Sequence, residues 1–317
     1  MNIEDKRFDR LLACPSCKSP SLTTVLQEII CKACGESFNI SYDTPVLIRH
    51  DSPVFVWYDP KKPSTPSTSK GVKQSLKALY RWLKPEDRVW SVKSQKVIQR
   101  LLEELNPDVG DNNVVLIGTG FESVYRQLLR PYKNILRIGL ATQGSVDLCT
   151  DICDIPLIND GVDLILSSSV LEHVYNPEKA VEEMFRVVKP RGYVYAEIPF
   201  MRAFHMMPVD YQRYTISGIE ELFKRHGFTL VSKGICSGPF TASVLFFEDF
   251  YGGLLSFNKY IMSATLLLLS VIFHPIKYLD RLFEDAKWAE INACNFYYVG
   301  KKNEVEDSKS KENDRLI

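Results

Sequence analysis

The sequence lacks several features that would assign it at once to a class of protein. Its 39 basic and 39 acidic side chains cancel, so there is no net positive charge with which to hold nucleic acid electrostatically. Eight cysteines in 317 residues are too few for a disulfide scaffold. The first residues show neither the basic start nor the apolar run of a signal peptide, so we expect a cytoplasmic location.

An apolar run long enough to cross a bilayer is also missing. The uncharged stretch from Ile261 to Phe273 has 13 residues and is followed by His274 and Pro275. A transmembrane helix needs about 20 residues, so we expect no membrane span. With 45% hydrophobic and 25% charged residues, the composition is that of a soluble globular protein.

Four of the eight cysteines lie in two CxxC pairs. Cys14 and Cys17 form the first pair, and Cys31 and Cys34 form the second. Four thiolates complete the tetrahedral shell of a structural zinc ion and leave no open position for catalysis. Gly35 follows the second pair and suits the left-handed turn that such a knuckle needs. Two disulfides or four idle thiols are the alternatives, and a reducing cytoplasm disfavours the first.

The pattern around these cysteines predicts a zinc ribbon over residues 1–58. Short strands are expected at residues 22–26 and 37–40, and bound metal would supply folding free energy that so small a core lacks. Residues 11–15 and 43–48 resemble the small zinc-ribbon activator subunit of tRNA and protein methyltransferases. The other four cysteines look incidental.

Residues 59–71 contain three prolines and five hydroxyl residues, which predicts an extended linker. Residues 72–84 have one apolar and one basic face, which predicts a helix that packs on its own domain or lies on an anionic membrane or nucleic acid. A second helix is expected over residues 89–105. Residues 302–317 are charged and without periodicity, so we expect a disordered tail.

From Asn113 onward, strands and helices alternate, as in a parallel α/β sheet. Strands are expected at residues 114–117, 134–139, 161–166 and 193–198. A helix is expected after Asn176, which suits an N-cap, with Pro177 in its first turn.

Four segments of this region, which follow one another in the chain, carry a family resemblance: residues 151–156, 162–167, 170–174 and 183–192. Together they resemble class I S-adenosylmethionine-dependent methyltransferases over residues 113–236. The resemblance implies a seven-stranded Rossmann-like sheet whose last strand, at residues 295–301, is antiparallel. The methyltransferase domain would then span residues 72–301, with helices at 72–112 and a hydrophobic helical insert at 237–290.

The resemblance also implies a site for S-adenosyl-L-methionine, built from Gly118, Gly120, Asp151, Ile152, Ser167 and Ser168. The glycines would lie beneath the methionine part, the Asp–Ile pair would hold the adenine, and the serines would line the sulfonium side.

Three positions depart from the family pattern. Leu116 and Leu140 stand where acidic residues are usual, and Glu122 replaces a glycine. A lost charge-assisted hydrogen bond costs about 1.5–3 kcal/mol, so weaker cofactor binding is expected. A catalytically inactive methyltransferase-fold adaptor, whose ribbon binds a protein or RNA partner, is therefore the alternative function.

The segment at residues 205–215 concentrates polar and aromatic side chains after a strand end. In the family this loop faces the acceptor, and a methyl acceptor hydroxyl needs a base. His205 is the first candidate and Asp210 the second, while Arg213 would bind an acidic group of the acceptor. Alternatively, Asp210 and Arg213 only pair to hold the loop. His173 is expected to be structural.

The hydrophobic insert has two interpretations. It is either a helical cap that buries itself over the acceptor pocket, or an interfacial hairpin that reaches a lipid-linked acceptor. The prediction as a whole is a methyltransferase acting on a small, glycan or lipid-linked acceptor, with peripheral contact at the inner membrane face as an option.

Overall fold

The computed structural model describes residues 6–56, 85–86, 88–118, 125, 127–140, 146–205 and 209–304 of the chain. Several expectations lie outside the described residues: the linker at 59–71, the basic helix at 72–84, Gly120, Glu122 and the tail from residue 305.

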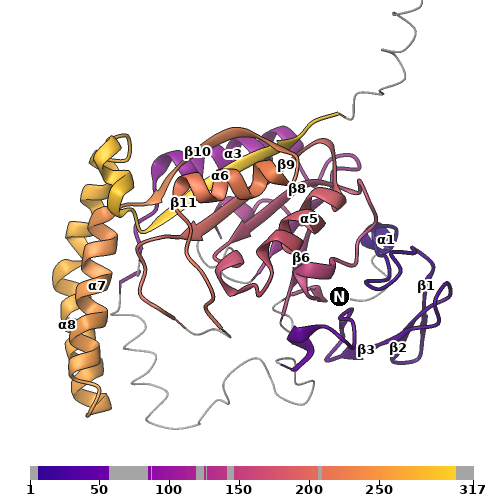
Figure 1. Cartoon of the computed structure of the whole chain (residues 1–317), viewed down its shortest axis with the longest axis horizontal. Coiled ribbons are helices and arrows are strands. Elements are labelled where there is room, and N and C mark those ends of the chain that lie inside the picture. Colours follow the sequence, from indigo (N-terminus) through magenta and orange to yellow (C-terminus); the bar gives the residue numbers. More distant parts are fainter. Residues whose placement is uncertain are drawn as a thin grey trace, which may run out of the picture.

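A seven-stranded sheet forms the centre of the molecule (Figure 1), in the order β10-β11-β9-β8-β5-β6-β7. Its strands are β5 (Val114–Ile117), β6 (Ile135–Gly139), β7 (Leu148–Cys149), β8 (Val162–Ser168), β9 (Val188–Pro199), β10 (Phe228–Ser237) and β11 (Asn295–Lys302). β11 runs antiparallel to both of its neighbours, and the pairs from β9 to β7 are parallel. The fold expected from the sequence is confirmed.

Helices cover both faces of this sheet. Val114 and Leu116 of β5 pack in the cluster of α3 (Val92–Leu105), whereas Val115 and Ile117 pack in the cluster of α5 (Pro177–Val187) and α6 (Ile216–Arg225). This alternation buries every residue of the strand. The helices begin where capping side chains allow, because Ser91, Asn176 and Thr215 each accept a hydrogen bond from the first turn.

The N-terminal ribbon module (residues 6–56) carries a second, four-stranded sheet. The strands of this sheet are β1 (Leu22–Val25), β2 (Glu28–Cys31), β3 (Ser37–Ser41) and β4 (Thr44–Pro45). The module also contains α1 (Lys6–Asp9) and a 3-10 turn (Pro53–Val56). β1 and β3 were expected from the sequence. β2 was not expected, because it is short and ends at Cys31, the first residue of the second CxxC pair.

The ribbon module packs directly on the β7 edge of the large sheet. Val46 forms a parallel bridge with Cys149, and the Leu47 amide donates to the Cys149 carbonyl at 2.9 Å. On the other side of the module, the Ala13 amide donates to the Pro156 carbonyl at 2.9 Å. Apolar side chains of the module belong to the same buried cluster as α5 and α6. The module therefore extends the sheet and shares its core.

The insert between β10 and β11 is a helical hairpin. It consists of α7 (Pro239–Leu254), α8 (Lys259–Lys277) and 3-10 segments at Tyr278–Leu282 and Lys287–Asn292. The expectation that His274-Pro275 stops the apolar segment is wrong, because α8 continues through Pro275. Tertiary contacts hold the chain there: the Asp280 carboxylate accepts hydrogen bonds from the Gly238, Phe240 and Thr241 amides and so caps α7.

Because α8 continues through Pro275, the apolar segment is longer than the 13 residues counted in the sequence. Among the described residues, the segment Lys259–Leu282 is 24 residues long and apolar enough to cross a membrane by length and composition. The two helices of the insert differ in burial: α7 buries seven residues, as a cap would, whereas only Ser270 and Lys277 of α8 are buried. The hairpin stands at one side of the sheet, and the ribbon module lies at the opposite side (Figure 1).

Candidate functional site

The four cysteines of the ribbon module converge on one point. The sulfur atoms of Cys14 and Cys34 lie 3.7 Å apart, and those of Cys17 and Cys31 lie 3.5 Å apart. All four sulfurs lie within 4.8 Å of one another. Tetrahedral zinc with bonds of about 2.3 Å separates its ligands by about 3.8 Å, so the cluster has the dimensions of a zinc site.

Two left-handed residues close the matching knuckles of this cluster. Gly35 has a φ of 78° and donates its amide to the Cys31 carbonyl, as its position after the second pair led us to expect. Lys18 takes the equivalent position after the first pair with a φ of 59°, and its amide donates to the Cys14 carbonyl. The two CxxC pairs are thus folded alike.

The residues expected at the cofactor gather at the carboxyl ends of the parallel strands. Gly118 directly follows β5, Ser167 and Ser168 end β8, and Asp151 and Ile152 follow β7. Neighbouring parallel strands bring these positions to one edge of the sheet, where open α/β sheets bind ligands.

Gly118 could not be replaced at this edge. Its φ is +82°, and a Cβ atom there would lie 2.6 Å from Cγ2 of Val170. Its amide donates to the Ile138 carbonyl at 2.9 Å, which fixes the turn after β5. The glycine therefore permits a backbone conformation and a close approach that a side chain would prevent.

Asp151 connects the cofactor edge to the ribbon module. Its Oδ1 accepts a hydrogen bond from the Cys153 amide at 2.9 Å, and its Oδ2 accepts one from the Ser52 hydroxyl at 2.6 Å. Both Ser52 and Asp151 are buried. Because Ser52 belongs to the module, the module reaches the residue expected to hold adenine, which sequence reasoning missed.

Glu197 on β9 is a second residue that sequence reasoning missed. Its carboxylate is buried and accepts four hydrogen bonds, from the hydroxyls of Tyr125, Tyr195 and Ser168 and the thiol of Cys236. Cys236 is therefore not incidental. The available signal was one acidic residue near the carboxyl end of an otherwise apolar strand.

The donors of this network are held in their protonated form. Burial raises the pKa of Tyr125, Tyr195 and Cys236 well above the usual values. Ser168 was expected to line the sulfonium side, but its hydroxyl donates a hydrogen bond to the Glu197 carboxylate at 2.6 Å. The network thus fixes the position of the end of β8.

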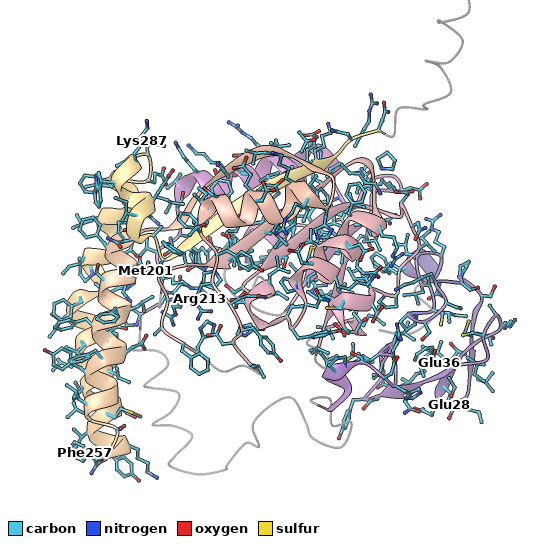
Figure 2. All side chains as sticks on the ribbon, in the orientation of Figure 1. Glu28, Glu36, Met201, Arg213, Phe257 and Lys287 are labelled. Atoms are coloured by element: carbon cyan, nitrogen blue, oxygen red, sulfur yellow. The ribbon has the colours of Figure 1, made fainter. Side chains whose placement is uncertain are left out.

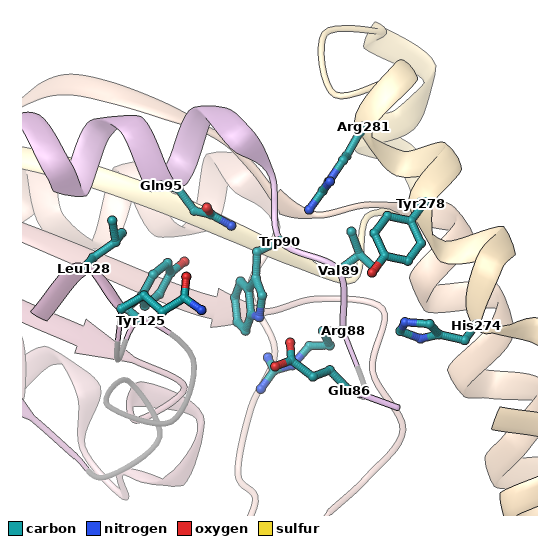
Figure 3. Close-up of a pocket in the computed structure, with 11 residues that line it drawn as sticks. Glu86, Arg88, Val89, Trp90, Gln95, Tyr125, Leu128, His274, Tyr278 and Arg281 are labelled. Atoms are coloured by element: carbon teal, nitrogen blue, oxygen red, sulfur yellow. The ribbon is translucent and has the colours of Figure 1, made fainter. Parts of the chain in front are cut away.

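A cavity of about 570 Å³ lies beside this network (Figure 3). Its walls come from the segment before α3, from the helix after β5 and from the hairpin base, and include Glu86, Arg88, Trp90, Gln95, Tyr125, Leu128, His274, Tyr278 and Arg281. The rings of Trp90 and Tyr125 lie 5.4 Å apart, and the Arg88 guanidinium lies 4.8 Å from the Trp90 ring centroid. Tyr125 therefore contributes both to the cavity wall and to the Glu197 network.

The predicted acceptor residues lie together in the loop after β9. Both guanidinium nitrogens of Arg213 donate to the Asp210 carboxylate, which also accepts from the His205 amide at 2.8 Å. The hydrogen bonds from Arg213 hold the pKa of Asp210 at about 2. Asp210 and Arg213 thus form the loop-holding pair that the sequence left open as an alternative.

His205 is the more exposed of the two candidate bases in the loop, His205 and Asp210. Its side chain is half-buried, and burial lowers its pKa, which favours the neutral ring at pH 7. The ring meets His173 edge to face at 5.1 Å, and Nδ1 of His173 lies 2.6 Å from the Val209 carbonyl. His173 therefore supports the loop, in agreement with a structural role.

Glu172 is buried directly beneath this pair of histidines. Its Oε1 lies 3.8 Å from Nε2 of His173, and burial raises the pKa of Glu172 to about 7. A carboxyl group with such a pKa changes its protonation state near neutral pH.

Comparison with known proteins agrees with this geometry. A family model described as a methyltransferase domain matches residues 117–196, from the end of β5 into β9. A curated UPF0434 protein of Nitrosococcus oceani is 40% identical over 52 residues, which are 16% of this chain and 88% of that protein. A match of that size fits the cysteine-rich ribbon module.

The chain belongs to the UPF0434 family through its ribbon module, and its central domain contains the segment that matches the methyltransferase-domain model.

Solved structures similar to this chain include the [4+2]-cyclase SpnF, at 14% identity and a TM-score of 0.43, covering 66% of this chain and 80% of that one. Phosphoethanolamine N-methyltransferase 2 of Haemonchus contortus has 15% identity and a TM-score of 0.42, covering 71% and 57%. A complex of the Haloferax volcanii Trm112 methyltransferase activator with a methyltransferase has 17% identity and a TM-score of 0.39, covering 65% and 89%. Such low TM-scores carry no conclusion about substrate.

Proposed function

We propose that this protein transfers a methyl group from S-adenosylmethionine to a small, glycan or lipid-linked acceptor. The observation that carries the proposal is the overlap between two findings. The methyltransferase model matches residues 117–196, and this segment contains the ends of β5, β7 and β8, where the predicted cofactor residues lie.

The residues at these strand ends fit the cofactor in part. At this sheet edge Gly118 makes a left-handed turn without a side chain after β5, and Asp151 and Ile152 follow β7. However, Leu140, which is 44% exposed, stands where the family usually has the acidic residue that binds the ribose hydroxyls. Gly118, Asp151, Ile152 and the β8 serines would hold the cofactor, which supplies an electrophilic methyl group on its sulfonium sulfur.

The acceptor loop supplies the groups that prepare the acceptor. The neutral ring of His205 can accept a proton from an acceptor hydroxyl. Arg213 is engaged by Asp210, so its role is to hold the loop in the conformation that presents His205. If a His205→Ala variant transfers methyl groups as fast as the wild type, the base assignment is wrong while the enzyme proposal stands.

Equilibrium binding of S-adenosylhomocysteine tests the enzyme proposal most directly. Calorimetry should detect binding to the wild type, and Leu140→Asp should tighten it about tenfold or more by restoring a carboxylate for the ribose. Val109→Asp, another apolar-to-acidic change at an exposed position, in the loop before β5, should leave the affinity unchanged. If neither the wild type nor Leu140→Asp binds at millimolar ligand, the adaptor is the better description.

The acceptor class can be tested without knowing the acceptor. Cell extract incubated with protein and S-adenosylmethionine carrying a labelled methyl group is partitioned between butanol and water. Label in the butanol phase supports a lipid-linked acceptor, whereas label only in the aqueous phase restricts the proposal to small or glycan acceptors.

We further infer that the ribbon module holds one structural zinc ion and acts on its own chain. Three contacts support this role: the bridge from Val46 to Cys149, the hydrogen bond from Ser52 to Asp151, and the ion pair of Lys18 with Glu183 at 2.9 Å. The first contact is made to β7 itself and the second to the segment directly after it. The third is made to α5, which packs on that segment. The exposed β1–β2 turn is the place we propose for a protein partner.

A further inference from the structure

Helix α8 of the α7–α8 hairpin has an inverted distribution of polar and apolar side chains. Its buried residues are Ser270 and Lys277, whereas α7 buries mainly apolar residues together with Glu248. Nζ of Lys277 lies 3.4 Å from Oε1 of Glu248, with side chains only 1% and 8% exposed. Helices of a water-soluble domain normally bury an apolar stripe and expose their charges, so this pair is the reverse of the usual arrangement.

The outer face of α8 is correspondingly apolar. Its exposed large side chains are Tyr260, Ile261, Leu268, Val271, Ile272 and Ile276, with Leu279 and Leu282 just beyond the helix. At about 100° per residue they cover about 160° of the helix circumference. A core-facing stripe of an ordinary amphipathic helix is about 100° wide. The broad stripe here points away from the sheet (Figure 2).

We propose that this outer face of the hairpin docks on a lipid surface. Lipid hydrocarbon can cover a broad convex stripe on several sides at once, whereas a folded protein partner would need a matching groove. Exposed apolar patches of this extent on a monomer mark interaction sites. The inference goes beyond the methyl-transfer proposal, because vesicle binding needs neither cofactor nor acceptor.

The shape of the hairpin favours an interfacial position over a crossing. Both helices return to the same side of the protein, because β10 precedes α7 and β11 follows the hairpin. The 16 residues of α7 span only about 24 Å, less than the hydrocarbon core of about 30 Å. Phe257 and Tyr260 at the tip are 77% and 73% exposed and suit the boundary between headgroups and acyl chains.

Apolar contact, rather than charge, would drive the docking. Residues 239–292 contain four basic and six acidic side chains, a formal sum of 4 − 6 = −2. Such a segment has no electrostatic preference for an anionic membrane. Binding should therefore occur on neutral vesicles and should withstand high salt.

A separate pocket of about 550 Å³ lies on the other helix of the hairpin, beside the acceptor loop. It is lined by Ala242, Leu245 and Phe246 of α7 and by the segment Phe200–Ala203 after β9. No residue of α8 lines it, so the outer face of α8 and this pocket are distinct surfaces.

Flotation of the full-length protein with neutral phosphatidylcholine vesicles tests the proposal. The protein should float with the vesicles both at low salt and at about 1 M salt, where charge interactions are screened. A Leu268→Glu/Ile272→Glu variant should bind at least about tenfold more weakly. Both positions are exposed, so circular dichroism should show an unchanged fold. The matched control, Val109→Glu in an exposed loop, should float like the wild type.

Three results would overturn the proposal. The first is no flotation with neutral vesicles. The second is binding to anionic vesicles alone that disappears at high salt, which would assign it to charged segments elsewhere. The third is a dimer in sedimentation velocity that Leu268→Glu/Ile272→Glu dissociates while vesicle binding is absent, which would make a second copy the occupant.

Discussion

The buried carboxylate of Glu197 should be essential for folding, and two substitutions separate its hydrogen bonds from its charge. Glu197→Leu has a similar size but leaves the donors from Tyr125, Tyr195, Ser168 and Cys236 without their acceptor. Glu197→Gln keeps one carbonyl oxygen for the two tyrosines and the thiol. The Ser168 hydroxyl can then rotate to accept from the new amide.

The two variants should differ strongly in stability. A buried donor without an acceptor costs about 1–3 kcal/mol, so four of them cost about 4–12 kcal/mol, and the whole free energy of unfolding of a domain is about 5–15 kcal/mol. Glu197→Leu should therefore fold poorly or not at all. Glu197→Gln replaces charge-assisted bonds by neutral ones and should lose about 1–4 kcal/mol.

Urea unfolding followed by circular dichroism measures these differences. Glu104→Gln, on the exposed side of α3, is the control for the loss of a carboxylate and should stay within about 0.5 kcal/mol of the wild type. If Glu197→Leu were as stable as the control, the four contacts would not contribute to folding and the reasoning would be refuted.

Three further predictions follow from other contacts. Cys14→Ser should lose the one zinc ion per chain expected from metal analysis and should melt at a lower temperature; a full zinc content in the variant would contradict the four-thiolate site. Because the folded pKa of Glu172 is raised to about 7, the protonated form is stabilised below the unfolded pKa near 4.5, and this contribution disappears as the pH rises through 7. Glu172→Gln should remove that loss, so its advantage over the wild type in urea unfolding should grow from nearly zero at pH 4 to about 3 kcal/mol at pH 8; an advantage independent of pH would assign it to another group. Lys18→Met should cost about 1–3 kcal/mol, because a buried carboxylate on α5 loses one of its cations, whereas the exposed Lys32→Met should cost little; equal effects would show that the ion pair contributes nothing.

Much of the central domain could be predicted because its signals are local. Val114–Ile117 is a short apolar run that can only be a buried strand, and Asn176 with Pro177 marks a helix start that the structure confirms. The β7 strand of two residues and the β2 strand of the ribbon module carry too little pattern to be found. Pro275 misled the prediction of the hairpin, because a proline ends an isolated helix but not one held by a neighbour.

The candidate site was predictable only at the level of positions. The sequence correctly indicated that four thiols form one cluster, and the residues predicted to hold the cofactor lie at or after the ends of parallel strands. It could not show that Ser52 binds Asp151 from 99 positions away in the chain, or that Glu197 collects four donors. Such contacts depend on the register and packing of distant segments, which have no local pattern.

The sequence by itself therefore determined the chemistry of the parts: the two CxxC pairs, the strand and helix periods, and the methyltransferase-like series at residues 151–192. Only the tertiary structure decided how these parts act together. It placed the ribbon module on the β7 edge, because backbone groups there pair across chain segments that are distant in sequence. It also turned Lys277 of α8 inward, toward Glu248 of α7, and left Leu268 and Ile272 of α8 exposed, since helix orientation depends on which face meets the neighbouring helix.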